Sequence, residues 1–356
     1  MTELDLAPPG PGEALVRLHA SGVCHSDLNA IDGTAATRCP AVLGHEGAGV
    51  VEQVGAGVDL VPGTPVVLSW LPACGRCDEC LRDLGHLCTT AWAGMETGGL
   101  LDGRPRLSRE GEPVYHYSFL SSFAERTVVP ARCCIPIPRD VPFEIAALVG
   151  CAITTGTGAV WRTADVRPGE RVCVLGCGGV GMSAVLGAVA VGADPIVAVD
   201  LSEGKLAAAL ELGATHAVRW AGSAEETAEH VREASGGGVD YAFEATGRTE
   251  AGLAAFLSTR ARGAAVMIGI PAADAVLELP ALAVPRLERR VLGSVYGSST
   301  PERDFPALLA LYQRGRLPLD RLVTQRLPLE AVEPAFDQLR AGTALRVVLD
   351  MNGGER

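Results

Sequence analysis

Four cysteines lie within fifteen residues of the sequence, at the spacing of a metal site. They are Cys74, Cys77, Cys80 and Cys88, at intervals of 3, 3 and 8 residues. A tetrahedral zinc ion takes four thiolates, and two residues between cysteines bring paired sulfurs to one centre with little strain. Four protein ligands leave no coordination position for a substrate. The spacing therefore predicts a structural zinc site.

These cysteines have two alternative interpretations. Ferredoxin-type iron–sulfur clusters also use short cysteine spacings, but their pattern usually has a proline after the last cysteine. Here Thr89 follows Cys88, which favours zinc over a cluster. The other alternative is a group of buried thiols without a metal.

A second set of metal-binding residue types is dispersed along the chain. Cys24 lies in the segment Gly22 to Asp27, and His45 and Glu46 lie 21 residues further on, in the segment Gly44 to Gly49. Taken alone, a histidine or cysteine is more often a packed core residue than a ligand. Three protein ligands would leave zinc an open position, where it lowers the pKa of a bound water or alcohol. The two segments together are candidates for a catalytic metal site.

A glycine-rich turn indicates a dinucleotide site. It comprises Gly176, Cys177, Gly178, Gly179, Val180 and Gly181. This turn follows a predicted strand and opens a predicted helix, and Asp200 ends the next predicted strand. A carboxylate there binds the adenosine ribose hydroxyls and repels the 2′-phosphate of NADP, so NAD is favoured. The alternative is that Asp200 only caps the helix that follows.

The helices and strands that must position these residues follow two different sequence patterns. Up to about residue 135 we expect short strands separated by glycine and proline, at 14–18, 47–54, 65–68 and 125–129. From about residue 153, strand and helix patterns alternate, as in βαβ units with a parallel sheet. The predicted strands there are 171–175, 196–200, 216–219, 239–244 and 264–268, and the predicted helices are 180–191, 203–212, 224–234 and 250–257.

The last part of the chain adds a strand at 291–295, helices near 304–314 and 330–340, and a strand at 346–349, which we expect to rejoin the first domain. The predicted domains are therefore residues 1–152 with 296–356, and residues 153–295.

Composition restricts the partners. The 356 residues are 48% hydrophobic and 20% charged, with a formal charge of -12, which argues against nucleic acid as a partner. We expect no membrane span, because the richest apolar stretch, 180–199, is broken by glycines, Asp194 and Pro195. Eleven cysteines then favour metal binding over disulfides in a soluble, cytoplasmic protein.

From about Pro9 to Asp350 the sequence resembles the zinc-containing medium-chain alcohol dehydrogenases. The segment from Gly44 to Val50 carries the family's signature around a metal ligand. The resemblance implies an α/β fold, with a GroES-like irregular β-rich catalytic domain and a Rossmann domain built on a doubly wound parallel sheet. It also implies NAD(H) and two zinc ions per chain. The ligands of the catalytic zinc would be Cys24, His45 and Cys151.

The resemblance implies roles for the neighbours of these ligands. Asp27 would accept the ring N–H of the ligand histidine, and Glu46 would lie behind the metal as a transient ligand. Ser26 would hydrogen-bond the substrate oxygen and pass its proton toward the cofactor ribose. Asn29 stands where many members have a histidine that ends this relay, and an amide does not take up a proton at neutral pH. The alternative for Ser26 and Asp27 is a turn or N-cap role.

Further residues are implied to contact the cofactor or the substrate. The cofactor residues are His25 and Arg346 at the phosphates, Lys205 near the adenosine ribose, and Thr155 and Ile268 at the nicotinamide. The pocket walls are Trp70, Trp92, Ala93 and Tyr117, although Trp92 and Tyr117 could instead be ordinary core aromatics. A long loop from Asp102 to Glu125, shared with dimeric relatives, favours a homodimer.

The expected activity is hydride exchange between NAD(H) and a primary alcohol or aldehyde, medium-chain or aryl, because the walls are apolar and aromatic. Three alternatives stay open. One is a dehydrogenase of a thiol–formaldehyde adduct, and another is a biosynthetic reductase of an enal, ketone or iminium. The third is a silent NAD-binding sensor or scaffold.

Overall fold

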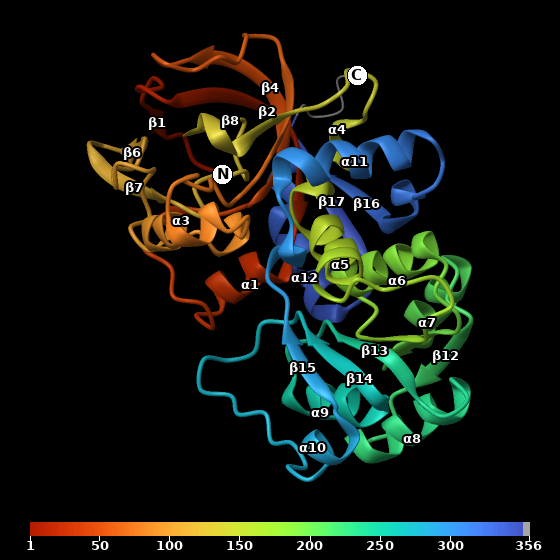
Figure 1. The fold of residues 1–356 in the computed structure, drawn as a ribbon. Helices are drawn as coiled ribbons and strands as arrows, with labels where there is room; N and C mark the ends of the chain where they lie inside the picture. Colours follow the sequence, from red (N-terminus) through yellow and green to blue (C-terminus); the bar gives the residue numbers. More distant parts are fainter. Residues whose placement is uncertain (352–356) are drawn as a thin grey trace. The chain divides into compact units, whose positions relative to one another are not determined.

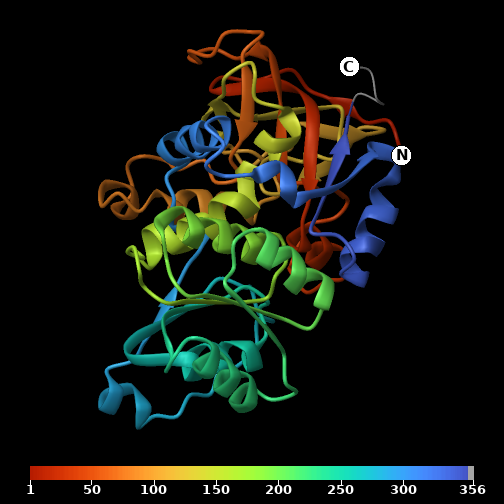
Figure 2. The same cartoon turned by 90° about the vertical axis from the view of Figure 1, so that its right-hand side faces the viewer.

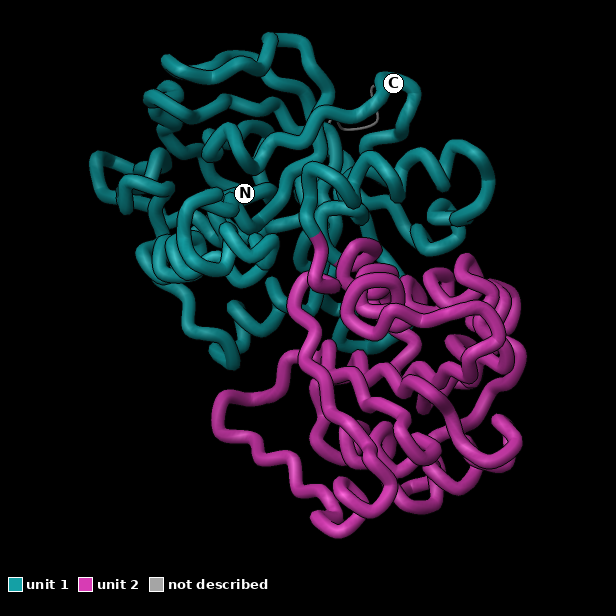
Figure 3. Tube along the Cα trace, viewed as in Figure 1, with its two compact units in different colours: residues 1–151, 300–356 teal, residues 152–299 magenta. Residues whose placement is uncertain are grey.

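The computed structural model describes residues 1–351, which form two compact units (Figure 3). The first unit runs from Met1 to Cys151 and resumes at Thr300, and the second runs from Ala152 to Ser299. The chain therefore passes between the units at 151/152 and 299/300, beside the junctions expected at 152/153 and 295/296. Each unit has a sheet and a hydrophobic core of its own.

The first unit is built on a seven-stranded sheet (Figure 1). Its order is β16 (Val323–Pro328), β17 (Arg346–Asp350), β2 (Glu13–Val23), β4 (Glu46–Val54), β5 (Pro65–Leu68) and β9 (Cys134–Pro136), with β8 (Arg126–Pro130) paired to β2. All pairs are antiparallel except β16 with β17. Because β17 pairs with β2, the last strand of the chain joins the first unit.

A smaller sheet and short helices complete this unit. The sheet has the order β1 (Asp5–Leu6), β6 (Leu107–Arg109), β7 (Glu112–His116) and β3 (Ala41–Val42). The helices are α1 (His25–Ile31), α2 (Asp78–Leu81), α3 (Thr89–Met95), α4 (Phe143–Leu148), α11 (Pro301–Gln313) and α12 (Val332–Ala341).

Strand β2 leads directly into a candidate metal ligand. Its first half alternates, with Val16 and Leu18 buried and Arg17 half-buried, as expected for a strand with one face on the core. From Ala20 to Val23 every residue is buried. The strand therefore delivers Cys24, the next residue, into the interior of the unit.

The second unit holds a six-stranded sheet in which every pair is parallel. Its order is β12 (His216–Arg219), β11 (Ile196–Asp200), β10 (Val172–Leu175), β13 (Val239–Glu244), β14 (Thr259–Met267) and β15 (Arg290–Gly293). The order reverses at β10, which is the topology of dinucleotide-binding folds. The predicted parallel sheet is confirmed.

Helices cover both faces of this sheet (Figure 2). They are α5 (Thr154–Gly158), α6 (Gly179–Val191), α7 (Glu203–Glu211), α8 (Ala224–Ala234), α9 (Thr249–Ser258) and α10 (Ala283–Leu287). Helices α6 and α7 lie on one face, and α8 and α9 lie on the other. The central strands are consequently buried on both sides, which is why β10 and β11 are almost wholly apolar.

One helix contradicts the expectation that the chain holds no apolar run of membrane-spanning length. Helical residues run from Phe143 to Thr163, with a mean hydropathy of 1.5 over the most apolar window. In the structure 78% of that window is buried, as in the core helix of a soluble protein. The run was missed because Gly150, Thr154 and Gly156 interrupt its apolar residues.

Candidate metal centres and cofactor site

The four clustered cysteines converge on one point. One sulfur from each of Cys74, Cys77, Cys80 and Cys88 lies within 4.8 Å of the others. The Sγ atoms of Cys74 and Cys80 are 4.0 Å apart, and those of Cys77 and Cys88 are 3.8 Å apart. Zinc–sulfur bonds of about 2.3 Å at tetrahedral angles place sulfurs about 3.8 Å apart. The donor set therefore fits a structural zinc ion.

Short helices and backbone amides hold these sulfurs in place. Cys77 precedes α2, and Cys88 caps α3 by accepting the N–H of Ala91 at 3.4 Å. Backbone N–H groups, that of Arg76 first, lower the pKa of Cys74 to about 5, whereas burial raises the pKa of Cys80 to about 12. The Cys80 thiol therefore keeps its proton at neutral pH until a cation displaces it.

A second cluster assembles from three distant parts of the first unit. Donor atoms of Cys24, His45, Glu46 and Cys151 lie within 4.8 Å of one another. Cys24 stands between β2 and α1, His45 immediately precedes β4, and Cys151 lies in a π-helical turn, Val149–Ile153, that follows α4. Such turns are frequent at functional sites. All four side chains are buried, with at most 9% of their surface exposed.

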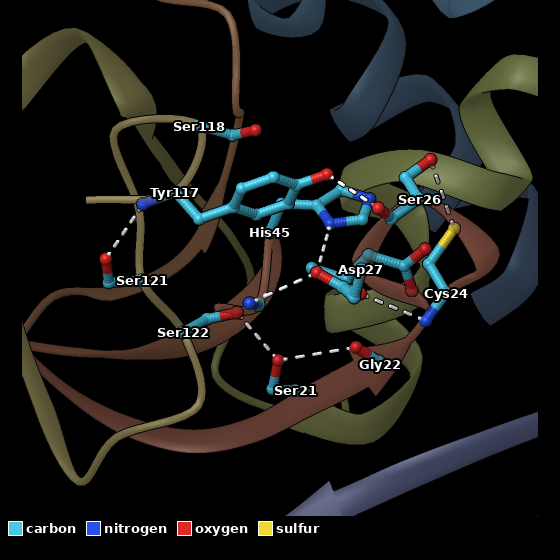
Figure 4. A network of polar contacts seen from close by, with 12 residues as sticks. Ser21, Gly22, Cys24, Ser26, Asp27, His45, Tyr117, Ser118, Ser121 and Ser122 are labelled. Atoms are coloured by element: carbon cyan, nitrogen blue, oxygen red, sulfur yellow. Dashed lines mark hydrogen bonds and ion pairs between the residues drawn. The ribbon is translucent and has the colours of Figure 1, made fainter. Parts of the chain in front are cut away.

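A buried carboxylate ties two of the ligand segments together (Figure 4). Oδ1 of Asp27 lies 2.9 Å from Nδ1 of His45 and accepts the N–H of Gly44 at 3.1 Å. Its Oδ2 accepts the N–H of Cys24, also at 3.1 Å. When Nδ1 carries the proton, Nε2 keeps a lone pair for a metal. Asp27 thus combines the arrangement expected behind a ligand histidine with the turn role given as the alternative.

Glu46 forms a buried ion pair that the sequence did not predict. Its Oε2 pairs with the guanidinium of Arg346, and both side chains are almost inaccessible to solvent. Within the described residues Oε1 has no hydrogen-bond partner, although it lies beside the metal-binding cluster. Gly22 leaves room for the pair, since a Cβ there would stand 2.0 Å from Oε2. A buried carboxylate oxygen without a partner fits a cation nearby.

In the second unit, the glycine turn has the close contacts that require glycine. Gly176 has a φ of +93°, and a Cβ on Gly181 would stand 1.7 Å from the Gly176 carbonyl oxygen. Gly178 caps α6, and its Cβ position faces open space. The first N–H groups of α6 are therefore accessible to a phosphate.

Asp200 lies against this turn with both oxygens engaged. Its Oδ2 accepts the N–H of Cys177 at 2.7 Å, and its Oδ1 accepts the N–H of Ser202 at 2.9 Å. Helix α7 is capped by Ser202, whose hydroxyl accepts the N–H of Lys205. Asp200 thus lies against the glycine turn, while the cap of α7 is Ser202. Ribose binding by Asp200 stays a prediction.

Both parts of the chain match known protein families, and the whole fold matches solved structures. The alcohol dehydrogenase GroES-like domain matches residues 10–139, and the zinc-binding dehydrogenase model matches residues 179–314. An alcohol dehydrogenase zinc-binding domain protein from Burkholderia ambifaria is 38% identical, with a TM-score of 0.93 over 98% of this chain and 94% of that chain. The chain belongs to the zinc-binding alcohol dehydrogenase family. The predicted resemblance and fold class are confirmed.

Two other solved structures extend the family comparison. Benzyl alcohol dehydrogenase from Acinetobacter calcoaceticus is 31% identical to this dehydrogenase, with a TM-score of 0.92 over 98% of this chain and 94% of that chain. An NAD-dependent alcohol dehydrogenase is 30% identical, with a TM-score of 0.78 over 99% and 95% of the two chains. The protein is accordingly a zinc-binding oxidoreductase whose relatives act on small molecules.

The two cysteines of the second cluster have pKa values that shift in opposite directions. A hydrogen bond from the Cys151 thiol, helped by the charges of His45 and Arg346, holds the pKa of Cys24 well below its usual range. The same hydrogen bond, together with burial, raises the pKa of Cys151. Burial raises the pKa of Glu46 to about 7, against the opposing charge of Arg346. Binding of a divalent cation would favour the ionised form of all three acids.

The structure separates the other predicted residues into two groups. Ser26, Tyr117 and Arg346 lie with the metal-binding cluster in the first unit, and His25 is exposed at the start of α1. Thr155 lies in α5, Lys205 in α7, and Ile268 just after β14, all in the second unit. The contacts of Thr155, Lys205 and Ile268 with a cofactor stay a prediction.

The four predicted pocket residues all lie in the first unit. The rings of Trp70 and Trp92 meet edge to face with centroids 5.8 Å apart. Trp92 is 38% exposed, and Ala93 beside it is also exposed, so the core alternative does not describe Trp92. Tyr117 is half-buried, and its hydroxyl has a polar partner. Whether these residues line a pocket stays a prediction.

One polar residue of the second unit was not predicted from the sequence. Glu244 ends β13 with 3% of its surface exposed, and its Oε1 accepts the N–H of Gly247 at 2.9 Å. It thereby fixes the turn whose Thr246 packs against Gly176. The signal was available, since an acidic residue at the end of a buried parallel strand points to the ligand-binding edge of such sheets.

Proposed function

We propose that this dehydrogenase transfers hydride between NAD(H) and a primary alcohol or aldehyde that carries a medium-chain or aryl group. The observation that carries the proposal is the buried cluster of Cys24, His45 and Cys151, with Asp27 behind the histidine. The aromatic pair of Trp70 and Trp92 supports an aryl substrate. The likeness to benzyl alcohol dehydrogenase supports the same choice.

The chain's own residues would have separate tasks in the reaction. A zinc ion held by Cys24, His45 and Cys151 would lower the pKa of an alcohol hydroxyl and polarise an aldehyde carbonyl. Asp27 keeps the Nδ1 proton of His45 in place. Ser26 hydrogen-bonds the substrate oxygen and accepts its proton. As it takes up that proton, Ser26 would donate its own hydroxyl proton toward the cofactor ribose. Because Asn29 offers no base, a water chain or another base would end the relay, or proton exchange would be slower.

A substrate panel tests this proposal. We expect NAD reduction with benzyl alcohol, with a kcat/KM at least about tenfold above that for ethanol, because apolar walls reward the larger group. Strong dependence of formaldehyde oxidation on added glutathione or mycothiol would instead identify a thiol-adduct enzyme. Turnover confined to enals, ketones or iminium ions would identify a biosynthetic reductase. Cofactor binding without turnover of any substrate would indicate a silent NAD-binding sensor or scaffold.

Asp200 should set the choice of cofactor. The Asp200→Gly variant removes the carboxylate that would bind the ribose hydroxyls and repel a 2′-phosphate. We expect the NAD/NADP ratio of kcat/KM to fall by about tenfold to a hundredfold, as for the loss of one charged hydrogen bond. Glu203→Gln is the matched control, because Glu203 is exposed and pairs only weakly with Arg219. An unchanged ratio in Asp200→Gly would contradict the assignment.

We also propose that the enzyme is a homodimer. Strand β15 is the edge of the six-stranded sheet, and its residues are exposed or half-buried. Val291 on this strand is 43% exposed, and Ile270, Val276 and Leu282 nearby in sequence are each more than 65% exposed. An unpaired, apolar edge of this kind favours association. A solution mass near 36.9 kDa, that of one chain, would contradict the proposal.

A cytoplasmic location completes the proposal. All eleven cysteines are free thiols, as expected in a reducing compartment. Cell fractionation tests this location, and recovery of the enzyme outside the cytoplasmic fraction would contradict it.

A further inference from the structure

A strained loop links β7 to β8 in the first unit. Ser118, Phe119 and Ser121 have φ values of +50°, +62° and +50°. Residues other than glycine rarely adopt the left-handed region, and three such residues in four positions persist only where the surroundings impose them. Strain of this kind gathers at functional sites. The contacts of the loop indicate what it does.

Hydrogen bonds fix the loop to both segments that carry metal-binding residues (Figure 4). The N–H of Ser122 donates to the carbonyl of Gly44 at 2.9 Å, next to His45. The hydroxyls of Ser122 and Ser21 lie 2.7 Å apart, and both side chains are fully buried. Ser21 precedes Cys24 by three residues. The loop therefore holds the segment of His45 and the segment of Cys24 at a fixed distance from each other.

Tyr117 makes a third connection from the same loop. Its hydroxyl donates to the carbonyl oxygen of Ser26 at 2.8 Å. Its ring meets the ring of His45 edge to face, with centroids 5.7 Å apart and an interplanar angle of 70°. A pocket wall needs only the ring, and phenylalanine would provide it. The hydroxyl has a different task, because it is bonded to the first turn of α1.

We propose that Tyr117 is a positioning residue, whose hydroxyl fixes the first turn of α1 and so aims the Ser26 hydroxyl at the substrate oxygen. The inference rests on the proposed function, which gives Ser26 its contact with the substrate. It assigns Tyr117 a role beyond that of a pocket wall. Since the hydroxyl bonds to a backbone carbonyl, it fixes the Ser26 backbone from which the side chain extends toward the substrate.

Amide hydrogen exchange tests the connection without any turnover. The Tyr117→Phe variant keeps the ring and removes only the hydroxyl. In the zinc-loaded enzyme, we expect exchange in the peptide covering residues 24–29 to quicken by about tenfold. Tyr115→Phe is the matched control, because Tyr115 lies two residues away and its ring contacts Arg38 instead. Unchanged exchange in Tyr117→Phe, in an enzyme of unchanged zinc content, would overturn the proposal.

A double-mutant cycle tests the role of Tyr117 in the reaction. We expect Tyr117→Phe to lower kcat on the order of tenfold, with KM for the alcohol changed less than about twofold. In the Ser26→Ala background the same substitution should cost less than about twofold, because nothing remains to be aimed. A full tenfold loss in that background would overturn the positioning role. If the enzyme oxidises no alcohol, the proposed function fails, and the exchange experiment still decides the contact.

Discussion

Replacing Cys24 by serine is expected to abolish turnover while leaving NADH binding and the fold intact. Cys24 is 7% exposed and lies within 4.8 Å of the donor atoms of His45, Glu46 and Cys151. A serine hydroxyl does not ionise as a thiol does, so the metal loses an anionic ligand. Lewis-acid stabilisation is worth several kcal/mol, and about 4 kcal/mol corresponds to a loss of roughly a thousandfold in kcat.

An activity assay, metal analysis and a titration with NADH check this expectation. The zinc content should fall from two ions per chain toward one. The Kd for NADH, measured by fluorescence titration, should stay close to that of the unaltered protein. Cys39→Ser is the matched control, because Cys39 is exposed and belongs to neither cluster. Full residual activity in Cys24→Ser would refute the zinc mechanism. Loss of NADH binding as well would mean that the substitution had damaged the fold.

The second unit was the more predictable part of the fold. The strands at 196–200, 216–219 and 239–244 and the helix at 224–234 were predicted with the bounds that the structure has. The strand at 196–200 is buried on both faces and is a continuous apolar run up to Asp200. The helix at 224–234 has a local start signal, because Ser223 caps α8 through its side chain. Local signals were sufficient there because each element follows its own pattern.

The first unit shows where such signals fail. Strand β2 extends to Val23, whereas the prediction ended at Leu18, because Ala20, Ser21 and Gly22 have low strand propensity. Their pairing with β4 and β17 imposes the extended conformation. The loop after β7 was unpredictable for a related reason, since nothing in Ser118 or Phe119 favours a positive φ.

The two metal centres differ in the same way. The four-cysteine site is local, so spacing alone was enough to predict it. The ligands of the second site are brought together from residues 24, 45 and 151, and Cys151 lies in a helical segment that was not predicted. Only the family resemblance joined them. The Glu46–Arg346 pair spans 300 residues and has no local signature at all.

Cys77→Ser is expected to remove the structural zinc and destabilise the first unit without emptying the second cluster. Three sulfurs would remain, so the ion would lose one of its four anionic ligands. Loss of a structural metal is among the mechanisms by which a single substitution lowers the free energy of unfolding most. A loss of roughly 3 kcal/mol would lower Tm by about 6–12 °C. Calorimetry and metal analysis, with a remaining zinc content near one per chain, measure both effects.

The Cys77→Ser substitution should also weaken substrate binding, because it releases Trp92. Helix α3 begins after Cys88 and carries Trp92, whose Nε1 donates to the carbonyl of His86 at 3.2 Å. When the cysteine cluster loosens, Trp92 is no longer held against Trp70. We therefore expect KM for benzyl alcohol to rise by about tenfold, while KM for NAD stays within twofold. Cys39→Ser again serves as the control, and an unchanged Tm with two zinc ions retained in Cys77→Ser would contradict a structural zinc site at these cysteines.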